Sequence, residues 1–241
     1  MINKDVAIVS GASRGIGRAI ALKFAEEGMA VALTARDKSK LEETAQMIRD
    51  DGGEWPLIIP ADLTDVYQIP QIAEKVMKEW GRIDALVNNA GVGYLKPFLD
   101  LTVDELQQML DVNIRAVFAL TQSVVPHMIQ RKSGTIINIA SLAGKNGFKL
   151  GTGYAASKWA LRGFAQCLMH EVREHDIRVV TIFPGSVDTV FGSGDSPTGT
   201  PRENMIQPGD VAYMAFMAYE MPTRTMVSEI DMRPSNPKKS G

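Results

Sequence analysis

Tyr154 and Lys158 lie four residues apart in the run Tyr154-Ala-Ala-Ser-Lys158, which has no proline and many helix-forming residues. On a helix this spacing places both side chains on one face. A phenol has an ordinary pKa of about 10, and a neighbouring ammonium stabilises the phenolate and lowers that pKa. Such a tyrosine can donate a proton to a carbonyl oxygen or remove one from an alcohol. Together with Asn113 and Ser141, the pair indicates a proton-transfer site.

A pair of this kind also occurs without chemistry, on a surface helix with an exposed lysine and a half-buried tyrosine. Other reactive side chains give no competing site. The three histidines, His127, His170 and His175, lack metal-ligand spacing, so we expect no metal site. The one cysteine, Cys167, lies in an apolar helical stretch, where a buried structural thiol is expected rather than a nucleophile.

A glycine-rich turn lies between the first apolar strand pattern and the first helical pattern. Its sequence is Ser10-Gly11-Ala-Ser13-Arg14-Gly15-Ile16-Gly17. Glycines in such a turn let the backbone approach a pyrophosphate, which the positive N-terminus of the helix favours. The spacing Gly-x3-Gly-x-Gly does not strictly match the general dinucleotide fingerprint, and a plain turn is the alternative. Its position in the opening strand–helix unit favours a phosphate-binding loop.

The residues after the second apolar run indicate which dinucleotide this loop would hold. The run 30–35 ends without a carboxylate and is followed by Arg36. A guanidinium at this strand end matches the 2′-phosphate of NADP, whereas an acid there would bind the free ribose hydroxyls of NAD. Arg14 is a second candidate for the same phosphate. Asp37 has the sequence distance of a ribose-binding acid, but we expect it one residue beyond the strand end and pointing away. NADP is therefore the expected cofactor.

The elements that would position these residues alternate along the chain. Strands are expected at 5–10, 30–35, 56–60, 84–88, 134–140, 177–183 and 226–232, and helices at 15–28, 38–51, 66–80, 102–131 with a break near 111, and 152–175. Most of the strands are apolar throughout, as is typical of strands covered on both faces. The alternation predicts an α/β doubly wound Rossmann fold, with a seven-stranded parallel sheet and helices on both faces.

Length and composition set further limits. The 241 residues carry no linker or repeat, so we expect one domain over 1–241. The chain has 26 basic and 28 acidic residues, so it has no excess of positive charge that would indicate binding to nucleic acid or to an anionic membrane. Apolar runs too short to span a membrane and an N-terminus that runs straight into a strand favour a cytoplasmic protein. The Gly-, Ser- and Pro-rich segment at about 189–208 is expected to be a mobile substrate loop or, alternatively, a disordered surface connection.

Several short motifs occur in one order along nearly the whole chain. They are Ser-Gly-Ala-Ser-Arg-Gly-Ile-Gly at 10–17, Asp62-Leu63-Thr64, Asn88-Asn89-Ala90-Gly91, Asn113-Ile114, Ser141, Tyr154-Ala-Ala-Ser-Lys158 and Pro184-Gly185. Each motif alone is weak, but the ordered set is very specific. The chain resembles the short-chain dehydrogenase/reductase family in its short, single-domain form, from about residue 4 to about 232.

This resemblance implies roles for cofactor-binding residues. Asp62, with Leu63 beside it, resembles the acid that contacts the adenine amino group. Asn89, Ala90 and Gly91 resemble the turn against the adenosine ribose; a purely structural role for that turn is compatible. Pro184, Gly185, Val187 and Thr189 resemble the segment that covers the nicotinamide.

The resemblance also implies catalytic roles. Tyr154 resembles the acid/base, and Lys158 the residue that lowers its pKa and binds the nicotinamide ribose. Ser141 resembles the hydroxyl that polarises the substrate carbonyl. Asn113 resembles an asparagine that distorts its helix and holds a water linked to Lys158; without the family it is an ordinary polar residue within a helix. These roles imply hydride transfer between NADPH and a carbonyl or alcohol.

The substrate is less defined by the sequence. Pocket candidates placed by loop position are Val92, Gly93, Tyr94, Leu142, Phe148, Ser186 and Phe191. Lys145 and Lys149 could meet an anionic substrate or be two solvated loop lysines. An apolar helix at 152–175 and the family resemblance predict a homodimer or homotetramer.

Three functions stay open at this stage. The first is a carbonyl reductase or alcohol dehydrogenase acting on a small molecule. The second is a 3-oxoacyl-[acyl-carrier-protein] reductase, although the ending at 226–239 lacks the Gly-Gly strand that the resemblance associates with that branch. The third is a nucleotide-sensing relative without chemistry, against which the occupied positions Tyr154 and Lys158 argue.

Overall fold

Seven parallel strands form one sheet in the computed structural model, which describes residues 2–189, 191 and 200–237. The order across the sheet is β3-β2-β1-β4-β5-β6-β7. The strands are β1 (Val6–Ser10), β2 (Ala30–Ala35), β3 (Leu57–Pro60), β4 (Ala85–Asn88), β5 (Gly134–Ile139), β6 (Ile177–Pro184) and β7 (Glu229–Met232). The predicted fold class is confirmed, because the order reverses between β1 and β4 as in a doubly wound sheet.

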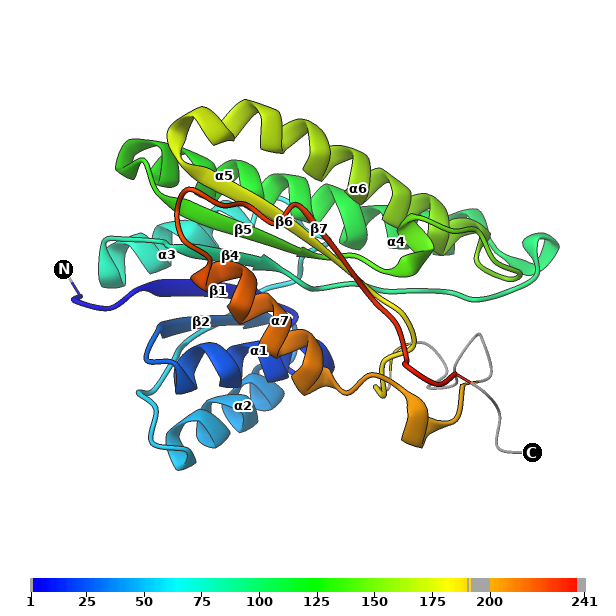
Figure 1. Cartoon of the computed structure of the whole chain (residues 1–241), viewed down its shortest axis with the longest axis horizontal. Coiled ribbons are helices and arrows are strands. Elements are labelled where there is room, and N and C mark those ends of the chain that lie inside the picture. Colours follow the sequence, from blue (N-terminus) through cyan, green and yellow to red (C-terminus); the bar gives the residue numbers. More distant parts are fainter. Residues whose placement is uncertain (1, 190, 192–199, 238–241) are drawn as a thin grey trace.

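Helices cover both faces of this sheet (Figure 1). They are α1 (Gly15–Glu26), α2 (Lys38–Asp50), α3 (Pro70–Trp80), α4 (Val103–Leu110), α5 (Ala116–Arg131), α6 (Thr152–Val172) and α7 (Pro208–Glu220). One apolar core joins the sheet to α1, α2 and α7, and a second joins it to α3, α5 and α6. The central strands are therefore buried on both sides, which explains their unbroken apolar runs.

The break expected near residue 111 is confirmed as a π-helical turn, Asp111–Arg115, between α4 and α5. Such turns insert one residue into a helix and are frequent at functional sites. The turn gives Asn113 its particular orientation, because the side chain at this position is directed into the interior and is fully buried.

Two expectations about the helices are wrong. Residues 208–220 form α7, although no helix was expected there. Pro208 occupies its first turn and the Gln207 and Asp210 side chains form a capping box, so the Pro-Gly pair begins a helix instead of a loop. Cys167 on α6 is exposed, because it lies on the outer face of that helix.

The segment expected at 189–208 lies partly outside the described residues. In its described part, Arg202–Asn204 form a 3-10 turn and Ile206 bridges to Val187. Within the described ranges, none of the helices combines the length and hydropathy needed to span a membrane.

Candidate active site

A cleft of about 700 Å³ lies along the carboxyl ends of the strands. The segments after β1, β2 and β3 line one end of it, and those after β4, β5 and β6 line the other. Parallel sheets bind ligands at this edge, where neighbouring connections run to opposite faces. Tyr154 and Lys158 from α6 line the same cleft as the glycine-rich loop.

The glycine-rich loop has the backbone needed to hold a phosphate. Gly11 and Gly15 adopt positive φ angles of 67° and 56°, a region that residues with side chains rarely enter. Helix α1 begins at Gly15, and its N-cap residue Arg14 makes no side-chain cap within the described structure. The first N–H groups of α1 are therefore available to a pyrophosphate in the cleft.

Gly17 serves the packing of α1, whereas the sequence predicted a direct contact with the cofactor. It is buried and is not among the described residues that line the cleft. A Cβ atom there would lie 2.3 Å from both the Gly11 carbonyl oxygen and the Asn89 amide nitrogen. Gly17 thus allows α1 to pack closely against the turn after β4, and its contribution to a cofactor would be indirect.

Basic side chains gather at the end of the cleft beyond β2. Arg14, Arg36 and Lys40 line it together with Asp62, Leu63 and Thr64. The Asp62 carboxylate accepts hydrogen bonds from the Thr64 backbone and hydroxyl at 3.0 and 2.9 Å. These bonds and the charge of Arg36 lower the pKa of Asp62, so it is ionised at neutral pH.

Asp37 borders this end of the cleft, contrary to the expectation that it points away. Its carboxylate caps α2, accepting from the Lys40 backbone N–H at 3.2 Å. That bond lowers the pKa of Asp37. One Asp37 oxygen is thus engaged in a hydrogen bond to the first turn of α2, while Arg36 lines the cleft.

The turn Asn89–Gly91 is both structural and part of the cleft. The Ser10 hydroxyl accepts from the Asn89 and Ala90 backbone N–H groups at 3.0 and 3.1 Å. The Asn89 amide donates to the Ser10 carbonyl at 2.9 Å. This turn therefore fixes the glycine-rich loop, and Asn89, Ala90 and Gly91 all line the cleft. Pro184, Gly185, Val187, Thr189, Ser13 and Ile16 also line it.

Tyr154 and Ser141 meet in the middle of the cleft. Burial raises the pKa of the Tyr154 phenol to about 12, and a hydrogen bond with the Ser141 side chain opposes that increase. The Ser141 hydroxyl also accepts from the Ala143 backbone N–H at 3.1 Å, because Ser141 caps the short 3-10 turn Leu142–Gly144. The two hydroxyls are thus held together at the end of β5.

Lys158 lies beneath this pair. Its ammonium donates to the Ile139 carbonyl at 3.0 Å and lies 5.9 Å from the centre of the Tyr154 ring. Burial lowers the pKa of Lys158 to about 8. The sequence predicted that Lys158 lowers the pKa of Tyr154. The net shift in the pKa of Tyr154 is upward, contrary to that prediction, because desolvation of the phenol dominates.

Asn113 supports the site from behind, because it is fully buried and lies outside the described lining of the cleft. Its amide donates to the Val92 carbonyl at 2.8 Å and to the Ser157 hydroxyl at 2.9 Å. Its carbonyl oxygen accepts from the Val92 N–H at 2.9 Å. The π-helical turn therefore ties the loop after β4 to α6.

The other end of the cleft is mainly apolar. Leu142, Phe148, Ser186 and Phe191 line it as predicted, with the Phe191 ring 5.6 Å from that of Tyr154. Tyr94 is not among its described lining residues, and its hydroxyl donates to the Gln108 side chain. Lining residues that the sequence did not single out include Leu95, Gln108, Val112, Asn146, Met205 and Arg233.

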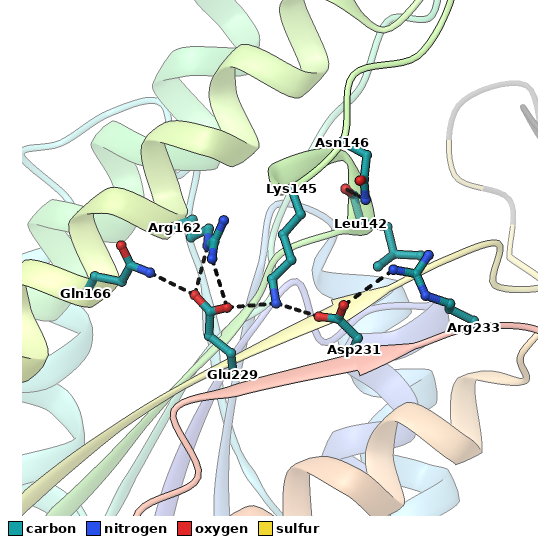
Figure 2. Close-up of polar contacts among 8 residues, drawn as sticks. All are labelled: Leu142, Lys145, Asn146, Arg162, Gln166, Glu229, Asp231 and Arg233. Carbon is teal, nitrogen blue, oxygen red and sulfur yellow. Dashed lines mark hydrogen bonds and ion pairs between the residues drawn. The ribbon is translucent and has the colours of Figure 1, made fainter.

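Neither of the two interpretations of Lys145 holds. Its ammonium lies 2.7 Å from Glu229 and 2.6 Å from Asp231 (Figure 2). The same ammonium lies 4.1 Å from the centre of the Phe183 ring. It is 18% exposed and is not among the described residues lining the cleft. Lys145 is therefore a structural cation between the 3-10 turn and β7. Lys149 is exposed and also lies outside that lining.

Within the described part of the chain, no three histidine, cysteine, aspartate or glutamate side chains form a group that could hold a metal ion. The cleft instead offers peptide N–H groups, cations and hydroxyls, which suit a phosphate-bearing cofactor.

Comparison with known proteins agrees with this geometry. Residues 5–198 match the family model for short chain dehydrogenases. An uncharacterized oxidoreductase of Staphylococcus saprophyticus is 38% identical over 233 residues, which cover 97% of this chain and 98% of the relative. A metagenomic short-chain oxidoreductase solved in complex with NADP is 38% identical, with a TM-score of 0.84 and coverage of 96% of this chain and 97% of that one.

A second solved structure is similar over the full length. It is an alcohol dehydrogenase from the archaeon Thermococcus sibiricus complexed with 5-hydroxy-NADP. It is 29% identical with a TM-score of 0.90, and the match covers 99% of this chain and 100% of the other. The ordered motifs, the doubly wound sheet and the match over most of its length show that this chain belongs to the short-chain dehydrogenase/reductase family.

Proposed function

We propose that this oxidoreductase is an NADPH-dependent enzyme that interconverts a carbonyl and an alcohol, with Tyr154 as the acid/base. The observation that carries the proposal is the hydrogen-bonded pair of Tyr154 and Ser141, which lies in the cleft of the glycine-rich loop above the Lys158 ammonium. A proton donor and a hydroxyl acting on one substrate oxygen are what carbonyl reduction requires.

The residues of the cleft fit NADP. The first N–H groups of α1 and the positive-φ glycines suit its pyrophosphate. Arg14, Arg36 and Lys40 provide cations where a 2′-phosphate would lie. Two similar solved structures are complexes with NADP or a derivative of it. The bound cofactor would supply the hydride, and NADP is proposed over NAD on these grounds.

The chain's own residues then handle the substrate oxygen. The Ser141 hydroxyl donates a hydrogen bond to the carbonyl oxygen and orients it toward the phenol. Tyr154 gives its proton to that oxygen as negative charge develops there, and takes it back in the oxidation of an alcohol. The Lys158 ammonium stabilises the resulting phenolate, because it is the cation beside the ring. Asn113 keeps α6 and the loop after β4 in place.

The experiment that tests this function follows NADPH absorbance while a panel of ketones, aldehydes and acetoacetyl thioesters is offered. Reduction of small carbonyl compounds supports the proposal. Turnover confined to the thioesters would favour a 3-oxoacyl-[acyl-carrier-protein] reductase. Nucleotide binding without turnover of any carbonyl compound would contradict the proposal and favour a nucleotide-sensing relative.

We further propose that the protein is a cytoplasmic homodimer or homotetramer. Trp159 on α6 and Phe118 on α5 are 49% and 51% exposed, which leaves large apolar groups for burial against another copy. A monomeric mass in analytical ultracentrifugation at micromolar concentration would contradict this proposal.

A further inference from the structure

Arg233 brings a positive charge to the substrate end of the cleft. It follows β7 directly, and its side chain is 58% exposed while lining the cleft. The position follows from strand pairing, because Met232 pairs with Pro184 and its carbonyl accepts from the Gly185 N–H at 2.8 Å. The chain at 232–234 thus runs beside the segment that closes the cleft after β6.

Several contacts place this segment next to Ser141. A Cβ atom on Gly185 would lie 3.2 Å from the Leu142 side chain and 3.3 Å from both the Met232 carbonyl oxygen and Pro234. Leu142 directly follows Ser141. Arg233 therefore shares a wall of the cleft with the hydroxyl pair, on the side away from Arg14 and Arg36.

Arg233 belongs to a chain of ion pairs in which its positive charge is only partly balanced by a carboxylate (Figure 2). Glu229 contacts the Arg162 side chain at 2.8 Å, Gln166 at 3.0 Å and Lys145 at 2.7 Å. Asp231 contacts Lys145 at 2.6 Å, and Arg233 only at 3.4 Å.

The cluster carries three cations, Lys145, Arg162 and Arg233, and two anions, Glu229 and Asp231, so its formal net charge is three minus two, or +1. The short contacts engage Lys145 and Arg162. The surplus positive charge therefore lies at Arg233, the member that faces the cleft.

The rest of this end of the cleft does not neutralise that charge. Its described lining holds Leu142, Asn146, Phe148, Ser186, Phe191 and Met205, among which there is no carboxylate. The acidic lining residues within the described structure, Asp37 and Asp62, lie at the end beyond β2 and β3. A largely apolar pocket that carries a cation and no carboxylate among its described lining residues favours an anionic ligand group.

We propose that Arg233 is a specificity-determining residue, and that it binds a carboxylate on the substrate, so that the enzyme acts on oxo acids or hydroxy acids. The planar guanidinium matches a carboxylate through paired N–H···O bonds. The contact with Asp231 orients the side chain without neutralising it. This inference rests on the proposed carbonyl chemistry at Tyr154.

The test compares each oxo acid with its methyl ester: pyruvate, acetoacetate and levulinate against methyl pyruvate, methyl acetoacetate and methyl levulinate. The wild-type protein is expected to have a higher kcat/KM for at least one acid than for its ester. Arg233→Met should lower that value about tenfold for the acid and leave the ester within about twofold, since a charge-assisted hydrogen bond contributes about 1.5 kcal/mol. Arg233→Lys should have a kcat/KM for the acid between those of the wild-type protein and Arg233→Met.

Lys149→Met is the matched control, because it removes a positive charge from the loop after β5 that does not line the cleft. This variant should change kcat/KM by no more than about twofold for either the acid or the ester. An unchanged KM for NADPH in Arg233→Met separates a substrate contact from a cofactor contact. Equal losses for acid and ester, a preference for esters in the wild-type protein, or a higher KM for NADPH would each overturn the inference.

A readout without turnover separates this inference from the proposed function. Calorimetry measures binding of acetoacetate to the protein saturated with NADP, before and after Arg233→Met; neither compound of this pair can donate a hydride to the other. Binding that weakens about tenfold supports the carboxylate contact even if no carbonyl compound is reduced. Binding that is unchanged by the substitution, or undetectable in the wild-type protein, overturns it, while reduction of neutral ketones would leave the proposed function intact.

Discussion

The Lys158 ammonium lies 5.9 Å from the centre of the Tyr154 ring, and its hydrogen bond goes to the Ile139 carbonyl. The phenol is instead hydrogen-bonded to Ser141. Burial therefore acts on both groups: it raises the pKa of Tyr154 to about 12 and lowers that of Lys158 to about 8. Each change favours the neutral form of the group. The site holds a protonated phenol over a lysine that is easily deprotonated.

The first prediction concerns the phenolic hydroxyl. Tyr154→Phe removes the proposed proton donor and its hydrogen bond with Ser141 while keeping the ring against Phe191. We expect kcat for carbonyl reduction to fall by about 10² to 10⁴, the usual contribution of general acid catalysis. The affinity for NADPH, measured by fluorescence titration, should change by less than about threefold.

Tyr94→Phe is the matched control, because the Tyr94 hydroxyl donates to Gln108 and lies outside the described lining of the cleft. This variant should retain most of the activity. Comparable turnover in Tyr154→Phe and Tyr94→Phe would remove Tyr154 from the proposed mechanism.

The second prediction is the pH dependence of carbonyl reduction. The reaction needs a protonated Tyr154, which its pKa of about 12 ensures at neutral pH, and a charged Lys158. Lys158 holds its proton below about pH 8 and loses it above. The value of kcat/KM for reduction should therefore be level at lower pH and decrease as pH rises through about 8.

In Lys158→Met no group at this position titrates, so the residual rate should lack that inflection. A wild-type profile that stays level up to pH 10 would show that the Lys158 charge does not control the reaction. Alcohol oxidation should instead become faster with rising pH, since it needs the phenolate.

The third prediction concerns the choice of dinucleotide. Arg36 lines the cleft after β2 and lies close enough to Asp62 to lower the pKa of that carboxyl. Arg36→Ala should raise the KM for NADPH about tenfold, because a charge-assisted phosphate contact is lost. The KM for NADH should stay within about twofold.

Lys38→Ala is the control for this substitution. Lys38 is exposed on α2, pairs with Glu42 and is not among the described residues of the lining. If Arg36→Ala changed the KM for NADPH and the KM for NADH by the same factor, Arg36 would not contact the 2′-phosphate.

The parts of the fold and site that the sequence predicted depend on local signals. Apolar runs such as 30–35 bury both faces of a strand wherever they lie in the sheet, so their pattern identifies them without tertiary information. The glycine-rich loop is similar, since Gly11 and Gly15 need positive φ angles in the turn itself. Tyr154 and Lys158 share a helical face through their spacing alone.

The parts that the sequence missed depend on contacts between distant segments. Arg233 reaches the cleft only because β7 pairs with β6 and brings Met232 beside Pro184. Lys145 is a structural cation only because Glu229 and Asp231 of that same strand face it. The sign of the Tyr154 pKa shift was also wrong, because it depends on how deeply the packed chain buries the phenol.

The last prediction concerns the ion pairs that attach β7 to α6. Burial alone would raise the pKa of Glu229, but hydrogen bonds from Arg162 and Lys145 lower it from 4.5 to about 2. Glu229→Gln removes the anion and leaves both cations with weaker partners. We expect a loss of about 2 kcal/mol in the free energy of unfolding, as for hydrogen bonds to charged groups. The matching decrease in Tm is roughly 4–8 °C for a chain of this size.

The pH dependence of that loss distinguishes an ion-pair effect from a packing effect. Because the folded-state pKa of Glu229 is depressed, its stabilisation is fully present above about pH 4.5 and disappears as pH falls through about 2. The difference between wild type and Glu229→Gln, measured by urea unfolding, should therefore be constant from pH 7 to 5 and shrink below pH 4.5. Glu174→Gln, at a side chain 76% exposed, should cost less than about 0.5 kcal/mol at every pH. A Glu229→Gln loss that stayed constant down to pH 2.5 would mean that packing, and not charge, connects β7 to α6.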